Sequence, residues 1–239
     1  MKALVRKCAG YLGYEIRKIH RPPAAAGLRG PSAVHHNSRP MREQFYEDSS
    51  QVESYLSAER RQFYRDVVAL LKANLPKLEA AVLRVADYGC GPGLLLRELG
   101  AATPGSEFHG YDFTLSGLAI ARETFPQARF EQRDIFDAYP DRFDVILCTE
   151  VLEHLERPYR ALKNLLKQLE PGGILLCTVP DGRVDQYAGH IHFWSPESWT
   201  IFVEDNCAGF DVRTGSVGAP AAPAFLYALI VAPGRRGGA

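Results

Sequence analysis

Residues 87–93 carry the side chains and spacing in this sequence that are best suited to binding chemistry. Asp87 stands just before a run in which glycine occupies every second position, at Gly89, Gly91 and Gly93. Glycine allows the backbone to turn tightly and to approach a ligand closely. The apolar residues that follow predict a helix, whose first N–H groups are unpaired and carry a partial positive charge. The segment therefore predicts a loop that binds a nucleotide-like ligand, with a purely structural turn as the alternative.

The identity of this ligand depends on three residues around the loop. A dinucleotide loop has the pattern Gly-x-Gly-x-x-Gly/Ala, but counting from Gly89 places Leu94 at the last position. Asp87 would repel a pyrophosphate and attract an ammonium group. Asp112, 19 residues after Gly93, ends a predicted strand and can accept hydrogen bonds from ribose hydroxyls. These residues favour S-adenosylmethionine, which has an ammonium and a sulfonium but no phosphate, over the alternative of a nicotinamide dinucleotide.

Alternating strands and helices must position this loop. Apolar runs and helical periodicity predict strands at 82–88, 108–112, 128–132, 143–149 and 174–179, with helices ending near 99 and spanning 115–124 and 158–169. Such near-continuous apolar strands are typical of a parallel sheet covered on both faces. After a helix at 196–206, two strands at 210–217 and 225–231 have no helix between them. This end of the chain predicts an antiparallel hairpin at the edge of the sheet.

Five segments near the predicted strand ends resemble class I S-adenosylmethionine-dependent methyltransferases. They are residues 85–93, 110–112, 133–135, 143–154 and 169–173, and the resemblance covers about residues 80–232. Residues 150–154, Glu-Val-Leu-Glu-His, are similar to small-molecule O-methyltransferases, including enzymes acting on quinone precursors and sugars. The resemblance implies a Rossmann-like, doubly wound α/β fold. Its seven-stranded sheet would be mostly parallel with an antiparallel edge hairpin, and helices would cover both faces.

The resemblance also implies a role for particular residues toward S-adenosyl-L-methionine. The three glycines would line its methionine portion, and Asp112 would hold the ribose. Asp134 would face the adenine amino group while Ile135 packs on the ring, and Glu150 would lie near the methyl donor. Together with Asp87, the predicted cofactor-binding residues are Asp87, Gly89, Gly91, Gly93, Asp112, Asp134, Ile135 and Glu150.

Candidate catalytic residues follow the fifth predicted strand, in residues 180–195. Methyl transfer to a hydroxyl benefits from a general base, and histidine is suited to that role near neutral pH. His190 and His192 would share one face of an extended segment, so we predict that one of them is the base. The alternative is that they order the loop or bind the substrate. His154 is interpreted as a residue that fixes the turn after the fourth strand.

Several other kinds of chemistry are disfavoured. No Asn/Asp-Pro-Pro-Tyr/Phe motif follows the fourth strand, which argues against methylation of base or glutamine nitrogens. Cys148 lacks the preceding proline of enzymes that methylate cytosine carbon. No acidic cluster has metal-binding spacing, so no metal ion is expected. The sequence thus predicts O-methylation of a small-molecule acceptor such as a sugar, a lipid-linked precursor or a quinone-type hydroxyl. The alternative is a non-catalytic, S-adenosylmethionine-binding subunit of a complex.

Charge is distributed unevenly along the chain and separates an N-terminal part from the rest. The whole chain has 28 basic and 28 acidic residues, yet residues 1–40 contain eight Lys or Arg and a single acid, Glu15. We predict a basic amphipathic helix with a linker over 1–40, a helical cap over 41–78 with one helix from about 53 to 74, and the cofactor-binding domain over 79–239. The amphipathic helix at 1–20 suits either peripheral membrane contact or packing and self-association. His35 and His36 are interpreted as solvated linker residues.

The remaining composition suggests where the protein works. Five cysteines without CxxC spacing indicate reduced thiols rather than a disulfide framework or a zinc site. No apolar run reaches the ~20 residues that a membrane span requires. We therefore predict a cytoplasmic protein, either free or peripheral at the inner membrane surface, with no nucleic-acid partner.

Overall fold

A computed structural model describes residues 37–74, 82–218 and 225–234, with residues 49–51 as backbone alone. All of these residues belong to the compact unit Pro31–Ala239. The predicted helix at 1–20, most of the linker, and His35 and His36 lie outside the described residues. None of the helices in the described ranges is long and apolar enough to cross a membrane.

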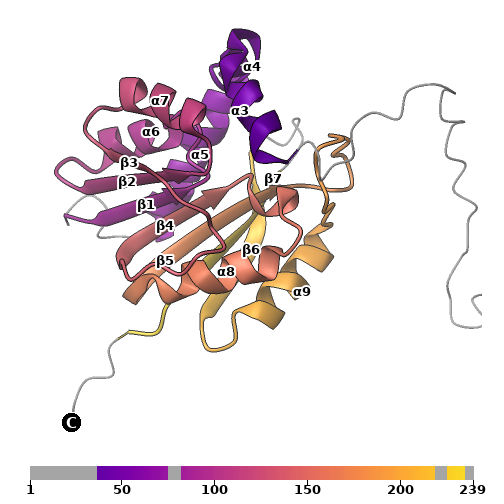
Figure 1. The fold of residues 1–239 in the computed structure, drawn as a ribbon. Coiled ribbons are helices and arrows are strands. Elements are labelled where there is room, and N and C mark those ends of the chain that lie inside the picture. The colour runs from indigo at the N-terminus through magenta and orange to yellow at the C-terminus, as the bar shows by residue number, and fades with distance from the viewer. Residues whose placement is uncertain (1–36, 75–81, 219–224, 235–239) are drawn as a thin grey trace, which may run out of the picture. The chain divides into compact units, whose positions relative to one another are not determined.

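A single seven-stranded sheet forms the centre of the fold, in the order β3-β2-β1-β4-β5-β7-β6 (Figure 1). The strands are β1 (Arg84–Tyr88), β2 (Glu107–Asp112), β3 (Arg129–Gln132), β4 (Phe143–Thr149), β5 (Leu169–Pro180), β6 (Asp211–Val217) and β7 (Phe225–Val231). Strands β1 to β5 are parallel, whereas β7 is antiparallel to both β5 and β6. The predicted fold class is therefore confirmed. The strand order reverses between β1 and β4, the place where open α/β sheets bind ligands at the carboxyl ends of their strands.

Helices cover both faces of the sheet, because side chains along each strand point alternately to its two sides. On one face Val85 packs with α5 (Ala58–Asn74), α6 (Leu94–Ala102) and α7 (Leu115–Thr124). On the other face Ala86 packs with α8 (Pro158–Lys167) and α9 (Pro196–Asn206) (Figure 1). Each buried Leu or Val side chain in these layers contributes roughly 1.5–3 kcal/mol of burial free energy. The two layers hold the strand ends, and thus the ligand loop, in place.

The helical cap differs from the prediction of one helix over about residues 53–74. The chain forms α4 (Ser49–Tyr55) and α5, separated at residues 56 and 57. The Ser57 hydroxyl oxygen accepts the Arg60 N–H at 3.1 Å, so a serine cap starts a new helix within the apolar pattern.

A further helix, α3 (Arg39–Glu47), begins within the residues predicted as linker. Its Glu43 carboxylate accepts the N–H groups of Leu115 and Ser116 at 2.8 and 2.9 Å. The N-cap residue of α7, Thr114, makes no side-chain cap bond of its own. Glu43 therefore caps α7 from another helix, and this contact docks α3 onto the sheet domain.

Strand β5 is longer than the prediction of 174–179, because it also includes residues 169–173 and Pro180. Leu169 pairs with Phe143 and Ile174 pairs with Val145, so the intervening residues form an irregular, bulged stretch. Gly172 adopts a φ of 78° there, which glycine tolerates without strain.

Candidate active site

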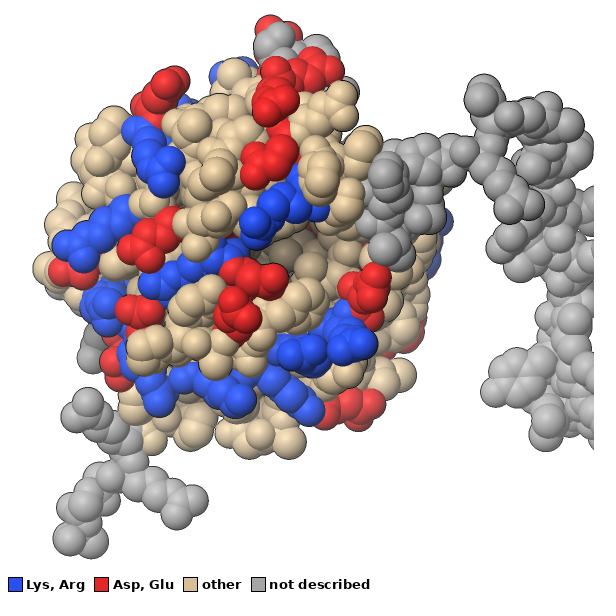
Figure 2. Space-filling view, in the orientation of Figure 1, with Lys and Arg blue, Asp and Glu red and all other residues tan. Residues whose placement is uncertain are grey.

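One cavity of about 770 Å³ opens at the carboxyl ends of the central strands. The cap helices and the segment after β5 complete its walls, and Figure 2 shows the molecule hollowed on this face with side chains of both charges at the rim. Most of the predicted site residues line this cavity: Asp87, Gly89, Gly91, Asp112, Asp134, Ile135, Glu150 and His190. Gly93 and His192 are not among the lining residues.

The glycines of the loop adopt backbone conformations that other residues avoid. Gly89, Gly91 and Gly93 have φ values of 77°, 47° and 74°. A Cβ atom at Gly89 would lie 2.3 Å from a methyl group of Val151, and one at Gly91 would lie 2.8 Å from the Tyr46 hydroxyl. Gly93 is the N-cap of α6 and closes the turn, which explains why it does not reach the cavity.

Asp87 has a buried carboxylate, and one of its oxygens has no hydrogen-bond partner among the described residues. Its side chain is 2% exposed, and its Oδ1 accepts no hydrogen bond from any described residue. Burial, and secondarily the Asp112 carboxylate, raise the pKa of Asp87 from 3.8 to about 8. A buried carboxylate of this kind fits a ligand that brings a positive charge to it.

Asp112 ties the glycine loop to the end of β2. Its Oδ2 accepts the Gly91 N–H at 3.0 Å, and its Oδ1 accepts the N–H and the hydroxyl of Thr114 at 2.9 and 2.7 Å. A carboxylate offers about four acceptor positions, so these three bonds leave one for a ligand. Asp134 is exposed near the cavity mouth, where its Oδ1 accepts the Phe136 N–H at 2.9 Å.

Glu150 occupies an unusual backbone conformation at the end of β4. Its φ of 57° is the one positive value at a non-glycine position in the described ranges. Such conformations cost about 1–3 kcal/mol and tend to occur at functional sites. The Thr178 hydroxyl donates to its Oε1 at 3.1 Å, and Arg60 Nη1 lies 4.0 Å from its Oε2. Burial raises the pKa of Glu150 to about 7, against the opposing effect of Arg60.

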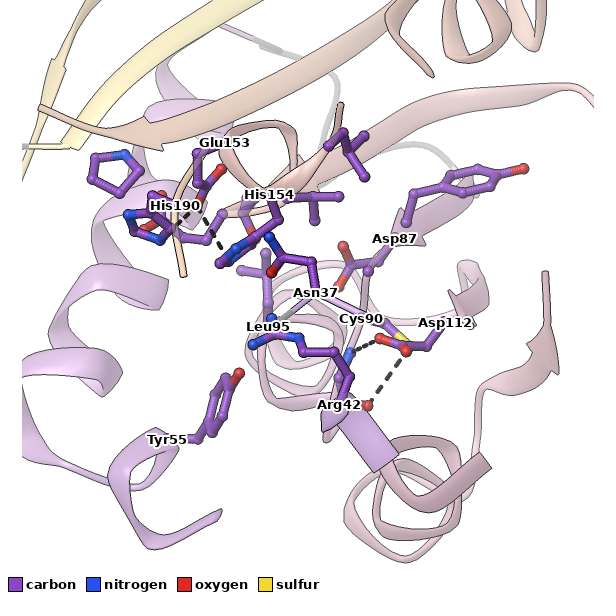
Figure 3. A pocket seen from close by; sticks show the side chains of 18 of the residues that line it. Asn37, Arg42, Tyr55, Asp87, Cys90, Leu95, Asp112, Glu153, His154 and His190 are labelled. Carbon is purple, nitrogen blue, oxygen red and sulfur yellow. Dashed lines mark hydrogen bonds and ion pairs between the residues drawn. The ribbon is translucent and has the colours of Figure 1, made fainter. Parts of the chain in front are cut away.

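A second polar group of residues lies across the cavity, formed by Glu153, His154 and His190 (Figure 3). Glu153 and His154 belong to the short helix η1 (Leu152–His154), whereas His190 comes from the segment after β5. The Nε2 atoms of His154 and His190 lie 3.9 and 3.8 Å from Glu153 Oε1. His190 Nδ1 lies 2.5 Å from Asp185 Oδ2, and His154 Nδ1 lies 3.3 Å from the carbonyl oxygen of Gly189.

Burial dominates the ionisation of this group of residues. It lowers the pKa of His154 to about 3, and it also lowers the pKa of His190 although Asp185 opposes that effect. Burial, with a further contribution from the Glu150 carboxylate, raises the pKa of Glu153 well above its ordinary value. Both imidazoles are therefore neutral near pH 7.

Comparison with known proteins identifies the family. Residues 56–206 match the family model described as a methyltransferase domain. The chain belongs to this methyltransferase-domain family. Among curated proteins, trans-aconitate 2-methyltransferase of Variovorax paradoxus is 38% identical over 115 residues, 47% of this chain and 44% of that protein. Ubiquinone biosynthesis O-methyltransferase of Roseobacter denitrificans is 29% identical over 136 residues, 51% of this chain and 54% of that protein. The chain thus spans about half the length of these relatives.

Solved structures share the fold of this methyltransferase domain. The N-methyltransferase NodS of Bradyrhizobium japonicum, in complex with S-adenosyl-L-homocysteine, superposes with a TM-score of 0.66 at 18% identity, covering 82% of this chain and 99% of that one. Magnesium protoporphyrin IX methyltransferase of Synechocystis with bound S-adenosylmethionine gives a TM-score of 0.59 at 20% identity, covering 86% and 100%. At these identities the likeness establishes the fold alone.

The two histidines predicted to share one face are separated in this domain. His192 Nε2 lies 2.9 Å from the Leu155 carbonyl oxygen, and its ring stacks on Trp194 at 4.9 Å. The Glu153 carbonyl accepts the N–H groups of both Ile191 and His192, at 2.8 and 3.2 Å. Because this double contact prevents the segment from being extended, His190 faces the cavity while His192 packs beside η1.

Two contributions to the cavity were missing from the sequence prediction. Arg42 and Tyr46 enter it from α3, and the Arg42 guanidinium lies 5.4 Å from the centre of the Phe45 ring. Both residues lie in the predicted helical cap over 41–78, but the one helix predicted within it began near residue 53, so these side chains had no expected position. The second omission is the grouping of Glu153 with two histidines. The only sequence signal for it is the adjacency of Glu153 and His154, since His190 follows 36 residues later.

Proposed function

We propose that this chain is an S-adenosylmethionine-dependent methyltransferase that methylates an oxygen atom of a small molecule. The observation that carries the proposal is the buried Asp87 carboxylate beside a glycine loop at the reversal point of the sheet, with an Oδ1 that accepts no hydrogen bond from the described residues. S-adenosylmethionine supplies an activated methyl group on a sulfonium. The protein then has to align the acceptor and exclude water.

The donor side of the cavity has groups suited to each part of this molecule. Asp87 would neutralise the ammonium group, and doing so would offset the cost of burying its own charge. Asp112 would use its remaining acceptor position for a ribose hydroxyl. Asp134 and Ile135 at the cavity mouth would contact the adenine, and Glu150 would lie near the sulfonium. Membership of the methyltransferase-domain family supports these assignments, which follow the pattern of the resembling segments.

The acceptor side is suited to a small organic molecule. A cavity of about 770 Å³ lies within the ~300–1,000 Å³ usual for small-molecule sites. Its walls include Phe45, Tyr55 and Phe63, with Arg42 and Arg60 among them. The names of the relatives, which refer to trans-aconitate and to ubiquinone biosynthesis, support a small-molecule acceptor.

His190 is the acceptor-side residue best placed to act on a hydroxyl. Asp185 holds its Nδ1, so Nε2 is the nitrogen that would take a proton from the acceptor. The sequence predicted either His190 or His192 as the base, and this proposal selects His190. His192 is assigned to ordering the segment.

Calorimetry and methyl transfer test the proposal together. The full chain is titrated with S-adenosylmethionine and with NADH, and labelled S-adenosylmethionine is incubated with host metabolite and lipid-linked fractions. We expect S-adenosylmethionine binding and label transfer to a small molecule. Binding of NADH alone would contradict the proposed donor. Binding of S-adenosylmethionine without formation of S-adenosylhomocysteine in any extract would favour a non-catalytic subunit instead.

The partner of the basic N-terminal segment and the cytoplasmic location stay predictions. If the segment at 1–20 binds an anionic membrane surface, the full chain should sediment with anionic liposomes and a chain lacking residues 1–40 should not. Equal sedimentation of the two chains would contradict membrane contact through this segment. A change in oligomeric state on truncation would support self-association.

A further inference from the structure

We propose that Glu153, His154 and His190 hold a divalent transition-metal ion on the acceptor side of the cavity. The sequence predicted no metal ion, because it contains no cluster of ligands at a recognisable spacing. The fold brings together two segments that are distant in sequence. The inference rests on the proposed function only for what the ion would act on, and it replaces the base role proposed for His190 with a ligand role.

The potential ligand atoms converge on one point. The Nε2 atoms of both histidines lie 3.8–3.9 Å from Glu153 Oε1, and the ligand atoms of the three residues all lie within 4.8 Å of one another. Figure 3 shows the three side chains pointing toward one another. Two imidazoles and one carboxylate form a set that binds zinc and iron(II).

Glu153 supplies an independent reason to expect a cation. Its side chain is 1% exposed, and neither carboxylate oxygen has a hydrogen-bond partner among the described residues. Buried carboxylates in proteins are normally hydrogen-bonded, paired with a charge or bound to a metal. A cation between Glu153 and the two imidazoles satisfies the carboxylate.

Contacts behind the histidines orient the correct nitrogen toward that cation. The Gly189 carbonyl can only accept a hydrogen bond, so His154 Nδ1 carries the proton and Nε2 keeps its lone pair. The Asp185 carboxylate fixes the same tautomer in His190. Asn37 Nδ2 also donates to the Gly189 carbonyl, at 2.8 Å, which holds this acceptor in place. A carboxylate or carbonyl behind each ligating histidine is the usual outer arrangement of protein metal sites.

The observed distances require little rearrangement to bind an ion. Nitrogen and oxygen ligands at ~2.0–2.2 Å from zinc lie roughly 3.0–3.5 Å from one another. The side chains would therefore move by less than about 1 Å. Because all three residues line the cavity, open coordination positions would face the acceptor. An ion there would polarise an acceptor oxygen, and His190 would then serve as a ligand rather than as a base.

Metal binding by the untagged full chain tests the proposal directly. Chelator-treated protein is titrated with Co²⁺ while visible absorption is recorded, and with Zn²⁺ against a chromogenic competitor. We expect one saturating equivalent, with a Co²⁺ spectrum typical of mixed nitrogen and oxygen ligands. Glu153→Gln and His190→Gln should weaken binding at least ~100-fold, and Asp185→Ala, which removes an outer contact, should weaken it ~10–100-fold.

Matched controls separate the site from other histidines and from misfolding. His192→Gln changes a histidine of the same segment that packs elsewhere, and a variant with His35→Ala and His36→Ala removes the other histidine pair. Both should bind Co²⁺ like the unaltered chain. Circular dichroism verifies the fold of each variant. No saturable Co²⁺ binding, or unchanged binding by Glu153→Gln, would overturn the proposal.

The metal and donor proposals fail separately in this design. Co²⁺ binding is measured without S-adenosylmethionine, and S-adenosylmethionine binding is measured in the presence of a chelator. If Co²⁺ binding alone is absent, the metal site is wrong and the methyl donor stands. If S-adenosylmethionine binding alone is absent, the proposed methyl donor is wrong and the metal site stands.

Discussion

The donor and acceptor sides of the cavity are built in different ways. The donor side comes from the ends of β1, β2 and β4, which are neighbours in the sheet, and Asp112 already bonds to Gly91 and Thr114 within it. The acceptor side comes from α3, η1 and the segment after β5, and its Glu153 and His190 meet across segments that are distant in the chain. The donor side is thus pre-organised by adjacent strands, whereas the acceptor side depends on contacts between segments that are distant in the chain.

This difference matches the demands on the two sides. A methyl donor that many enzymes share requires the same binding groups at the same strand ends. A sheet holds those groups with little freedom to move. Acceptor pockets on one scaffold are determined by the loops that cover it. Substitutions on the two sides should therefore have separable effects on donor binding and on turnover.

The largest separable effect is expected at His190. His190→Gln removes the cavity-facing nitrogen, and turnover with a responsive acceptor fraction should fall ~100–10,000-fold. S-adenosylmethionine affinity, measured by calorimetry, should change less than about threefold. His192→Gln is the matched control, with turnover retained within about tenfold. Equal losses in the two variants would show that the division between the histidines is wrong.

On the donor side, Asp87→Asn should stabilise the ligand-free protein. The folded-state pKa of about 8 exceeds the ordinary 3.8, so the folded state holds this proton more tightly than the unfolded state. The wild type therefore loses stability as pH rises from about 4 to about 8, by at most about 1.4 kcal/mol per unit. Between pH 5 and pH 8, urea unfolding should show the gap between variant and wild type widening by up to about 4 kcal/mol.

The same substitution should weaken S-adenosylmethionine binding, because the ammonium group would lose its counter-charge. A stability gap that is independent of pH would contradict the raised pKa of Asp87. Unchanged affinity would contradict its proposed contact with the donor.

Asp112→Ala should weaken S-adenosylmethionine binding by roughly 100-fold, which corresponds to about 2.7 kcal/mol. It removes both the ribose acceptor and the bonds that hold Gly91. Calorimetry measures the loss, and Asp134→Ala, at the exposed mouth, should cost less. An unchanged affinity in Asp112→Ala would exclude the ribose assignment.

The smallest effect concerns the connection between the cap and the sheet domain. Glu43→Gln weakens the cap on α7, so the free energy of unfolding should fall by about 1 kcal/mol. Glu47→Gln, an exposed change on the same helix, should have no measurable effect in urea unfolding. Similar values for the two variants would show that Glu43 does not dock α3.

Local sequence was sufficient for most of the sheet and for the positions of Asp87, Asp112 and Glu150 at its strand ends. Strands β4 and β7 and helices α7 and α9 have the predicted bounds, because long apolar runs and helical periods specify them strongly. The predicted helices of the cap were wrong where one polar residue decided the outcome. Ser57 starts α5 inside a continuous helical pattern, and Glu43 gives α3 a docking contact that no periodicity records.

The sequence by itself determined the mostly parallel sheet and the placement of the predicted binding residues at the ends of its strands. The sheet depends on local patterns of apolar residues, and the placement follows because parallel strands end at a common edge. Only the tertiary structure decided which histidine faces the cavity and which residues join Glu153. That decision depends on hydrogen bonds such as the one from Ile191 to the Glu153 carbonyl, which link segments far apart in the chain. Residue spacing carries no record of such contacts, so the acceptor side became visible only in the folded chain.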